Sequence, residues 1–397
     1  MNKAINNRVV VTGVGVVTPL KPFAGIDAFW QSLLSGEDAI RRCTPPMIDL
    51  GREWLMGRID TSGYPVRTMP EEKLEIIAEQ AVRMALEDAK FQDGVMKAIS
   101  VGTVLGNVLH KEKRLMEGKK QKTEDDNKRE SLAFIRSFIE KRFSFSSGGV
   151  TVSTACASGT DAIGIAARKI SAGKEDVMIA GGTDILSDLA ISGFHVLQAL
   201  TEEKVRPFDK GRTGLALGEG AAFVVLETER HAEKRGTKIY GKIMGYGSSA
   251  DANHLTGPHR EGRGLVSAME QAISGAGIKP GEIDYINAHG TGTLYNDRME
   301  TIAIKKVFGE RAYHIPVSST KSMLGHSFGA AGAVEAICCL LSIKDKKIHP
   351  TINYREKDPE CDLDYVPNTA RTHDVNIAMS LSAGFGGQNS AIIIGAA

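Results

Sequence analysis

Short runs of β-branched residues alternate with helix-like segments along this chain, and two such series follow one another. The apolar runs of the first series lie at 8–15, 98–106, 150–154, 176–182 and 221–227. Helix-like stretches lie between them, for example at 71–89 and 157–170. This alternation predicts an α/β fold whose strands are largely buried.

The pattern restarts near residue 240. The second series of expected elements begins with a strand and turn at 241–249. It continues with strands at 284–290, 316–321, 377–384 and 389–395 and helices at 264–276 and 297–307. Because both series share one strand–helix order, we expect a duplication at the level of the fold. The glycine-rich segment 245–249 is the natural boundary, so we assign 1–245 to a first half and 246–397 to a second.

Bulk properties exclude several classes of function. The net charge of +1 provides no global field toward nucleic acid or a membrane. The five scattered cysteines include no CxxC pair, which fits a reducing cytosol and argues against disulfides or a zinc site. We therefore expect a cytoplasmic protein that binds no metal. The mixed charge run at 119–129 predicts a solvated loop, and Val9 to Val17 predicts a first strand rather than a signal peptide.

Cys156 has the strongest local signal for chemistry. It lies in a turn between a buried strand that ends at Thr154 and a helix that opens with small residues. The unpaired N–H groups and the dipole of a helix N-terminus favour a thiolate. The small neighbours Ala155, Ala157 and Gly159 leave the turn uncrowded, as a nucleophile elbow requires. The segment by itself is equally consistent with a buried structural cysteine.

Two further segments place polar groups beside glycine-rich turns. His289 follows a strand and precedes a loop whose hydroxyls and amides could hold polar ligand atoms. Lys321 and His326 flank another turn, and Glu335 lies where its carboxylate could fold back toward Lys321. Taken singly, these residues could also be a structural histidine, a surface lysine and a helix-capping histidine.

A glycine-rich loop surrounds Phe385 between the last two expected strands. Such a loop can supply a backbone N–H donor and an aromatic gate, although a plain β-turn has the same pattern. Two other glycine patterns fall short of nucleotide sites. Thr18 stands where a dinucleotide fingerprint needs its third glycine, and Ile243 replaces the Ser or Thr of a phosphate loop.

Together these segments resemble the elongating β-ketoacyl-[acyl carrier protein] synthases over nearly the whole chain. The resemblance rests on the ordered set TACASG, RPFDKGRTGLALGEGAA, NAHGTGTLYND, STKSMLGHSFGAAGAVE and GFGGQNS. It implies a five-layered α-β-α-β-α thiolase fold, usually dimeric. It also implies an acyltransferase of fatty acid or polyketide biosynthesis, which condenses malonyl-[acyl carrier protein] with an acyl group held on the cysteine.

The resemblance assigns roles to the catalytic candidates. Cys156 matches the acylated nucleophile, and His289 and His326 match the two histidines that mark the elongating group. Lys321 matches the family lysine, and Glu335 matches its partner.

Other positions match groups that hold the substrate. The N–H of Phe385, the gating aromatic, would form an oxyanion hole with the N–H of Cys156. Thr291 and Thr293 match positions that contact the phosphopantetheine arm. The resemblance implies no resident cofactor, because the acyl carrier protein partner brings the phosphopantetheine.

The chain also departs from the family pattern. Residues 107–147 are highly charged where the family has an apolar segment that contributes to the dimer interface and the acyl pocket. Gly211 and Thr213 replace acids, and Gln388 replaces a common Thr. These changes hint at polyketide or polyene assembly and leave a homodimer or a heterodimer open. The alternatives are a chain-length-setting partner subunit, which usually lacks the cysteine, and a thioester hydrolase.

Overall fold

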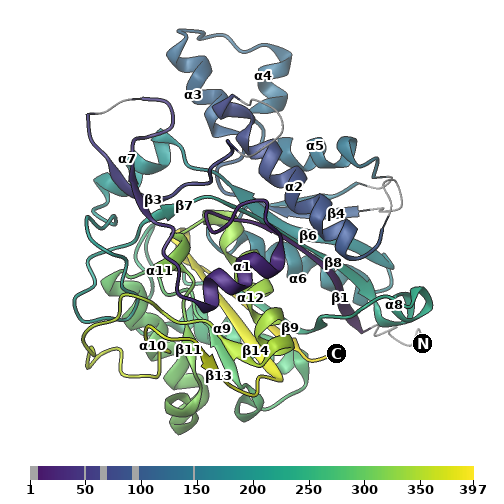
Figure 1. Cartoon of the computed structure of the whole chain (residues 1–397), viewed down its shortest axis with the longest axis vertical. Coiled ribbons are helices and arrows are strands. Elements are labelled where there is room, and N and C mark those ends of the chain that lie inside the picture. The colour runs from purple at the N-terminus through teal and green to yellow at the C-terminus, as the bar shows by residue number, and fades with distance from the viewer. Residues whose placement is uncertain (1–7, 49–50, 63–68, 92–97, 146–147) are drawn as a thin grey trace.

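A ten-stranded mixed sheet forms the frame of the molecule (Figure 1). The computed structural model describes residues 8–48, 51–62, 69–91, 98–145 and 148–397. The strands follow the order β11-β10-β14-β15-β9-β1-β8-β6-β4-β5. The sheet therefore divides into two five-stranded halves, which join where β1 pairs antiparallel with β9.

The two halves of the sheet repeat one topology. From the centre outward, the first half consists of β1 (Val9–Val17), β8 (Gly220–Thr228), β6 (Val177–Asp184), β4 (Ala98–Gly102) and β5 (Val150–Val152). In the same order, the second half consists of β9 (Gly241–Ala250), β15 (Gln388–Gly395), β14 (Ile377–Gly384), β10 (Tyr285–Asn287) and β11 (Val317–Ser318). In each half the two inner pairings are antiparallel and the two outer pairings are parallel. The predicted duplication is confirmed.

Helices cover the outer faces of both halves. α2 (Lys73–Asp88) and α5 (Phe134–Arg142) pack on strands of the first half. α9 (Arg263–Ala276) packs on β9 and β15 of the second half, and α10 (Leu294–Phe308) packs against α9. With the two central helices described next, these layers give the predicted α-β-α-β-α arrangement.

The central layer consists of α6 (Ser158–Ser171) and α12 (Ala331–Asp345), which contact each other and strands of both halves. Small residues allow the two helices to approach at their N-terminal ends. A Cβ added at Gly159 would lie 2.6 Å from the carbonyl oxygen of Gly329 and 2.9 Å from the nitrogen of Ala333. The segments that precede the two helices are therefore brought close together.

The remaining elements are shorter and surround this frame. The helices are α1 (Ile26–Leu34), α3 (Val108–Met116), α4 (Glu124–Arg129), α7 (Asp188–Val196), α8 (Glu229–Arg235) and α11 (Lys321–Leu324). The strands are β2 (Arg41–Cys43), β3 (Trp54–Gly57), β7 (Leu217–Gly218), β12 (Lys347–Ile348) and β13 (Arg371–Thr372). None of the helices in the described part of the chain is long and apolar enough to cross a bilayer.

Pairs of glycines on the first strand of each half allow a helix to pack closely, and the pair in β1 belongs to the glycine pattern that falls short of a dinucleotide fingerprint. A Cβ at Gly15 in β1 would lie 1.9 Å from the carbonyl oxygen of Ala81 in α2. A Cβ at Gly247 in β9 would lie 2.1 Å from the carbonyl oxygen of Ala268 in α9. Both glycines thus serve close helix–strand packing, and the repeat of this contact is a further sign of the duplication.

The charge run at 119–129 does not form the predicted solvated loop throughout, because residues 124–129 form the helix α4. Thr123 caps this helix by accepting the N–H of Asp126, whose carboxylate in turn binds the N–H of Thr123. The side chain of Arg114 in α3 binds Glu130 at the end of α4. Figure 1 shows α3 and α4 standing out at one end of the molecule.

The predicted boundary between residues 245 and 246 falls inside β9. The topology places the start of the second half at Gly241, because β9 is the counterpart of β1. The segment 245–249, expected to end a strand in a turn, is extended throughout.

Substitution of Gly247 by Ala tests the helix–strand packing. We expect the change to lower the free energy of unfolding by about 1–3 kcal/mol, because the new Cβ meets a backbone oxygen that cannot rotate away. Gly193→Ala in α7 is the control, since the added Cβ meets no heavy atom within 4 Å outside the backbone of its own helix. Urea unfolding of both variants measures the difference, and equal stability would contradict this account of the packing.

Candidate active site

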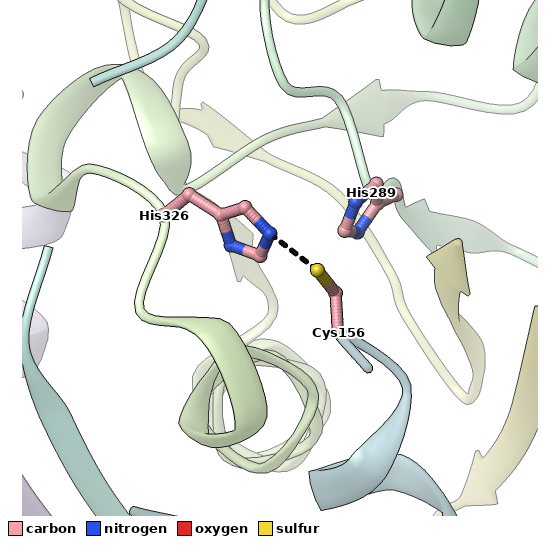
Figure 2. A group of neighbouring side chains, drawn as sticks. All are labelled: Cys156, His289 and His326. Carbon is pink, nitrogen blue, oxygen red and sulfur yellow. Dashed lines mark hydrogen bonds between the residues drawn. The ribbon is translucent and has the colours of Figure 1, made fainter. Parts of the chain in front are cut away.

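Three side chains from distant segments converge on one sulfur atom (Figure 2). Cys156 lies between β5 and α6, His289 follows β10, and His326 follows α11. The Nε2 atom of His326 lies 2.9 Å from the Sγ atom of Cys156. The sulfur and one ring nitrogen of each histidine all lie within 4.8 Å of one another. The structure thus brings together the three residues that the sequence singled out.

The turn that carries Cys156 is held by hydrogen bonds on both sides. The N–H of Thr154 donates to the hydroxyl of Ser158 over 2.9 Å, and this hydroxyl donates to the carbonyl oxygen of Ala155 over 2.5 Å. Ala155 has a φ of 49°, in the left-handed region that a non-glycine residue rarely adopts. The backbone therefore turns sharply and presents the sulfur at the start of α6.

Burial dominates the electrostatics of the sulfur. Burial raises the pKa of the Cys156 thiol to about 12, although Lys321 and the N–H of Phe385 lower it. The position before α6 had predicted a thiolate. In the resting site, the cost of desolvating the thiolate exceeds the stabilisation by the helix N-terminus, Lys321 and the N–H of Phe385. The thiol is therefore the stable form, and a base must take its proton during attack.

Both histidines of this cluster favour the neutral form. Burial lowers the pKa of His289 and of His326 well below the usual range, and the charge of Lys321 lowers both further. The two ring centroids lie 5.2 Å apart with nearly perpendicular planes. A neutral imidazole can accept one proton and donate another, so each ring can act either as a base or as a hydrogen-bond donor.

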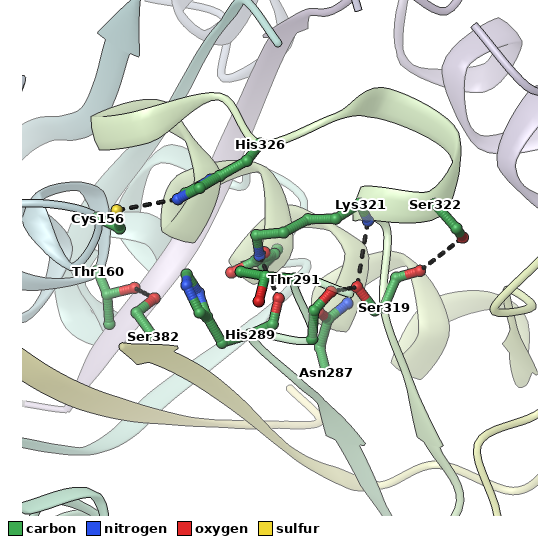
Figure 3. A network of polar contacts seen from close by, with 12 residues as sticks. Cys156, Thr160, Asn287, His289, Thr291, Ser319, Lys321, Ser322, His326 and Ser382 are labelled. Carbon is green, nitrogen blue, oxygen red and sulfur yellow. Dashed lines mark hydrogen bonds and ion pairs between the residues drawn. The ribbon is translucent and has the colours of Figure 1, made fainter. Parts of the chain in front are cut away.

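Lys321 forms a buried ion pair with Glu335. Figure 3 shows the Lys321 side chain extending toward His289. The Nζ atom of Lys321 also donates to the carbonyl oxygen of His289 over 2.5 Å. Burial raises the pKa of Glu335 to about 7, and Lys321 opposes this rise. The predicted return of Glu335 toward Lys321 is confirmed, and the pair fixes the backbone that carries His289.

Phe385 lies at the tip of the β14–β15 hairpin, directly against the turn that carries Cys156. Its backbone N–H donates to the sulfur of Cys156. A Cβ added at the preceding Gly384 would lie 2.9 Å from the nitrogen of Cys156, so the two segments touch. The Phe385 ring stacks on the ring of Phe194 with centroids 5.2 Å apart. The N–H groups and the aromatic ring predicted to act together are thus in one place.

A cavity of about 370 Å³ leads from the surface to these residues. Cys156, His289, His326 and Phe385 line it, and so do Thr291 and Thr293, whose hydroxyl oxygens lie 2.9 Å apart. Within the described residues, Cys156 and the two histidines are the one group of His, Cys or acidic side chains close enough to hold a metal ion. The nearby charge of Lys321 opposes a second cation at this point.

Two residues of the site carried no clear signal in the sequence. Glu300 in α10 accepts the N–H groups of His289 and Gly290 over 2.6 and 2.8 Å. Burial raises the pKa of Glu300 to about 8. Phe194, the partner of Phe385, lies in α7 outside every motif, and its role depends on a contact between residues far apart in the chain.

Comparison with known proteins places these residues in a family context. The models of the beta-ketoacyl synthase N-terminal domain and C-terminal domain match residues 6–58 and 72–232, and residues 240–355. The chain is 37% identical to 3-oxoacyl-[acyl-carrier-protein] synthase 2 of Coxiella burnetii, over 98% of each chain.

Two solved structures are similar over 99% of this chain and all of theirs, each with a TM-score of 0.90. One is a type II polyketide acyl-carrier protein in complex with its ketosynthase bound to the hexaketide, 33% identical to this chain. The other is the ishigamide ketosynthase/chain length factor, 34% identical.

The state of the sulfur can be tested by alkylation. Because the pKa of Cys156 lies near 12, we expect its rate of reaction with iodoacetamide to rise about tenfold per pH unit from pH 7 to 9. Mass spectrometry of the Cys156 peptide measures this rate. Lys321→Met should slow the reaction at each pH, since it removes the nearby positive charge. A rate that levels off below pH 8 would instead indicate a stable thiolate.

Proposed function

Because the chain belongs to the β-ketoacyl synthase family, we propose that Cys156, His289 and His326 join a malonyl-derived two-carbon unit to an acyl thioester. The chain is a β-ketoacyl-[acyl carrier protein] synthase and therefore an acyltransferase. The observation that carries the assignment of residues is the 2.9 Å contact between His326 and the Cys156 sulfur at the end of a cavity that His289 also lines.

The first step transfers the acyl group to the enzyme. The sulfur of Cys156 attacks the thioester carbonyl while its proton passes to Nε2 of His326. The carbonyl oxygen becomes an oxyanion and accepts the backbone N–H groups of Cys156 and Phe385. When the intermediate collapses, the phosphopantetheine sulfur leaves and takes the proton from His326, and the acyl group remains on Cys156.

The second step generates the carbon nucleophile. Malonyl-[acyl carrier protein] enters with its thioester oxygen facing the two histidines. Loss of CO2 leaves an enolate, and His289 stabilises the enolate oxygen through a proton on the ring nitrogen that faces the sulfur. His326 can donate as well once its ring proton has moved from Nδ1 to Nε2, the nitrogen that acted as the base in the first step. Neutral imidazoles suit this task, since burial and Lys321 keep both rings uncharged.

The third step forms the carbon–carbon bond. The enolate carbon attacks the acyl carbonyl on Cys156, and the new oxyanion returns to the N–H groups of Cys156 and Phe385. Collapse releases the cysteine sulfur and a β-ketoacyl thioester. The released thiolate takes up one proton, consistent with the high pKa of the buried thiol.

The other predicted residues support these steps without direct bond changes. Lys321 keeps the histidines neutral, and Glu335 balances its charge. Thr291 and Thr293 line the cavity and offer hydroxyls to the amides of the phosphopantetheine arm. Phe385 with Phe194 forms an aromatic gate beside the sulfur. The reaction balances without a resident cofactor or metal, because the carrier brings its own thioester.

We propose an acyl carrier protein as the donor of both substrates and a second ketosynthase-like chain as the structural partner. The similar structures contain a carrier bound to its ketosynthase and a ketosynthase with a chain length factor. In this chain, the apolar side chains Leu189, Val196 and Leu197 on and after α7 are exposed, and Leu197 also lines the cavity. An apolar surface beside the site suits a protein partner, either a second copy or a related subunit.

Substitution of Cys156 by Ala tests the assignment. We expect condensation to be lost, because no acyl-enzyme can form, while decarboxylation of malonyl-[acyl carrier protein] persists at the two histidines. Cys43→Ala, which removes a partly exposed thiol away from the site, should leave both activities intact. Product analysis by mass spectrometry separates the outcomes. Normal condensation by Cys156→Ala would refute the role of this cysteine.

The same assay separates the alternative functions. A thioester hydrolase would release free acid without consuming malonyl-[acyl carrier protein]. A chain-length-setting subunit would not become acylated when it is purified alone.

Substitution of His289 by Ala tests the enolate step. One missing donor should slow decarboxylation about 100–1000-fold. Acyl transfer to Cys156 should change less, because His326 is the base in that step. His110→Ala is a matched control, since the His110 ring binds Asp126 in the α3–α4 segment. If His289→Ala decarboxylates malonyl-[acyl carrier protein] at the wild-type rate, this role is wrong.

A further inference from the structure

Helix α6 holds both arms of the β14–β15 hairpin whose tip carries Phe385. The hydroxyl of Thr160 lies 2.9 Å from the hydroxyl of Ser382 in β14, and Figure 3 shows this contact close to the site. The next residue, Asp161, accepts a hydrogen bond from the hydroxyl of Ser390 in β15. Two successive residues of one helix turn therefore hold the two strands that flank the tip.

The Asp161 carboxylate also holds the turn at residues 154–157 that carries Cys156, which we call the nucleophile turn. Its second oxygen accepts the hydroxyl of Thr154, two residues before Cys156, over 2.6 Å. Its first oxygen accepts the hydroxyl of Tyr246 in β9 over 2.8 Å as well. Asp161 is 2% exposed, so these bonds form away from water. One buried carboxylate thus joins the turn that carries the sulfur to the strands β9 and β15.

These contacts bear on the two N–H groups that would bind the oxyanion. The N–H of Cys156 belongs to the nucleophile turn, and the N–H of Phe385 belongs to the hairpin tip. The two belong to different halves of the chain, and local backbone geometry cannot fix the distance between them. Donors of this kind stabilise charge only when they are held in place before the reaction begins.

We propose that Thr160 and Asp161 are positioning residues that fix the N–H of Phe385 relative to Cys156 and so assemble the oxyanion hole. The inference rests on the function proposed above. Neither side chain lines the cavity that contains the sulfur. Both act through other residues: Thr160 through Ser382, and Asp161 through Ser390 and Thr154.

The proposal separates two kinds of step. Acyl transfer and condensation place negative charge on an oxygen between the two N–H groups. Both steps therefore need the hydrogen bonds by which Thr160 and Asp161 hold the hairpin. Decarboxylation of malonyl-[acyl carrier protein] places its charge on an oxygen that faces His289 and His326. Loosening the hairpin should therefore slow acyl transfer and spare decarboxylation, a split that general destabilisation would not produce.

The test compares paired substitutions in the full-length enzyme. Thr160→Val removes the hydroxyl and keeps the volume, while Thr160→Ser keeps the hydroxyl and removes a methyl group. Ser390→Ala and Asp161→Asn change the second arm. Tyr240→Phe is the control, because it also removes one buried hydroxyl bond, to Lys238, but lies away from the hairpin. The readouts are acyl loading of Cys156 by intact mass, CO2 release from malonyl-[acyl carrier protein], and thermal unfolding.

We expect Thr160→Val, Ser390→Ala and Asp161→Asn to load the acyl group at least tenfold more slowly, with CO2 release within twofold of the wild type. Thr160→Ser and Tyr240→Phe should stay within twofold in both assays. Equal losses in both assays, or no loss in loading, would overturn the proposal. If Asp161→Asn does not fold, the comparison of Thr160→Val with Thr160→Ser decides whether the proposal holds. Failure of the wild type to load Cys156 would instead refute the proposed function.

Discussion

The close approach of α6 and α12 is the contact on which the rest of the site depends. Gly159 in α6 lies against the backbone of Gly329 and Ala333, where a single methyl group would collide with main-chain atoms. Because the two helices meet at their N-terminal ends, the turn before α6 and the segment before α12 meet as well. The sulfur and the His326 ring come from these two segments. The contact between Cys156 and His326, which lie 170 residues apart in sequence, thus depends on small side chains at one helix crossing.

Burial gives these groups their protonation states. Removed from water, a thiol keeps its proton and an imidazole loses its charge, so the resting site contains a neutral donor next to a neutral acceptor. Lys321 places a positive charge near these groups, and its ion pair with Glu335 offsets the cost of burying that charge. This charge lowers the pKa of the sulfur, which favours a transition state with negative charge near Cys156. It also lowers the pKa of both histidines, so the rings stay neutral in the resting site.

Much of the fold and of the site could be predicted from the sequence, because both depend on local patterns. Alternating apolar runs indicated the strands. The motifs around Cys156, His289, Lys321 and His326 indicated the chemistry only together, through their resemblance to the β-ketoacyl synthases. The α4 helix was missed because its stability comes from the Thr123 cap and from charged pairs one helical turn apart, which the composition alone does not distinguish from a loop.

Other features depend on contacts that no local pattern shows. The high pKa of Cys156 follows from burial by several segments, which outweighs the helix terminus that the sequence indicated. The link from Asp161 to Ser390 spans 229 positions, and the stacking of Phe194 on Phe385 likewise joins remote segments. Such contacts exist only after the two halves have packed together.

The duplicated topology has a consequence for how this enzyme can have arisen. Each half repeats the same five strands, yet the sulfur comes from one copy and both imidazoles come from the other. A symmetric pair of identical ancestral units would have carried every group twice, at two equivalent places around the axis. In this single polypeptide neither half contains all three groups, so the site exists only where the two halves meet.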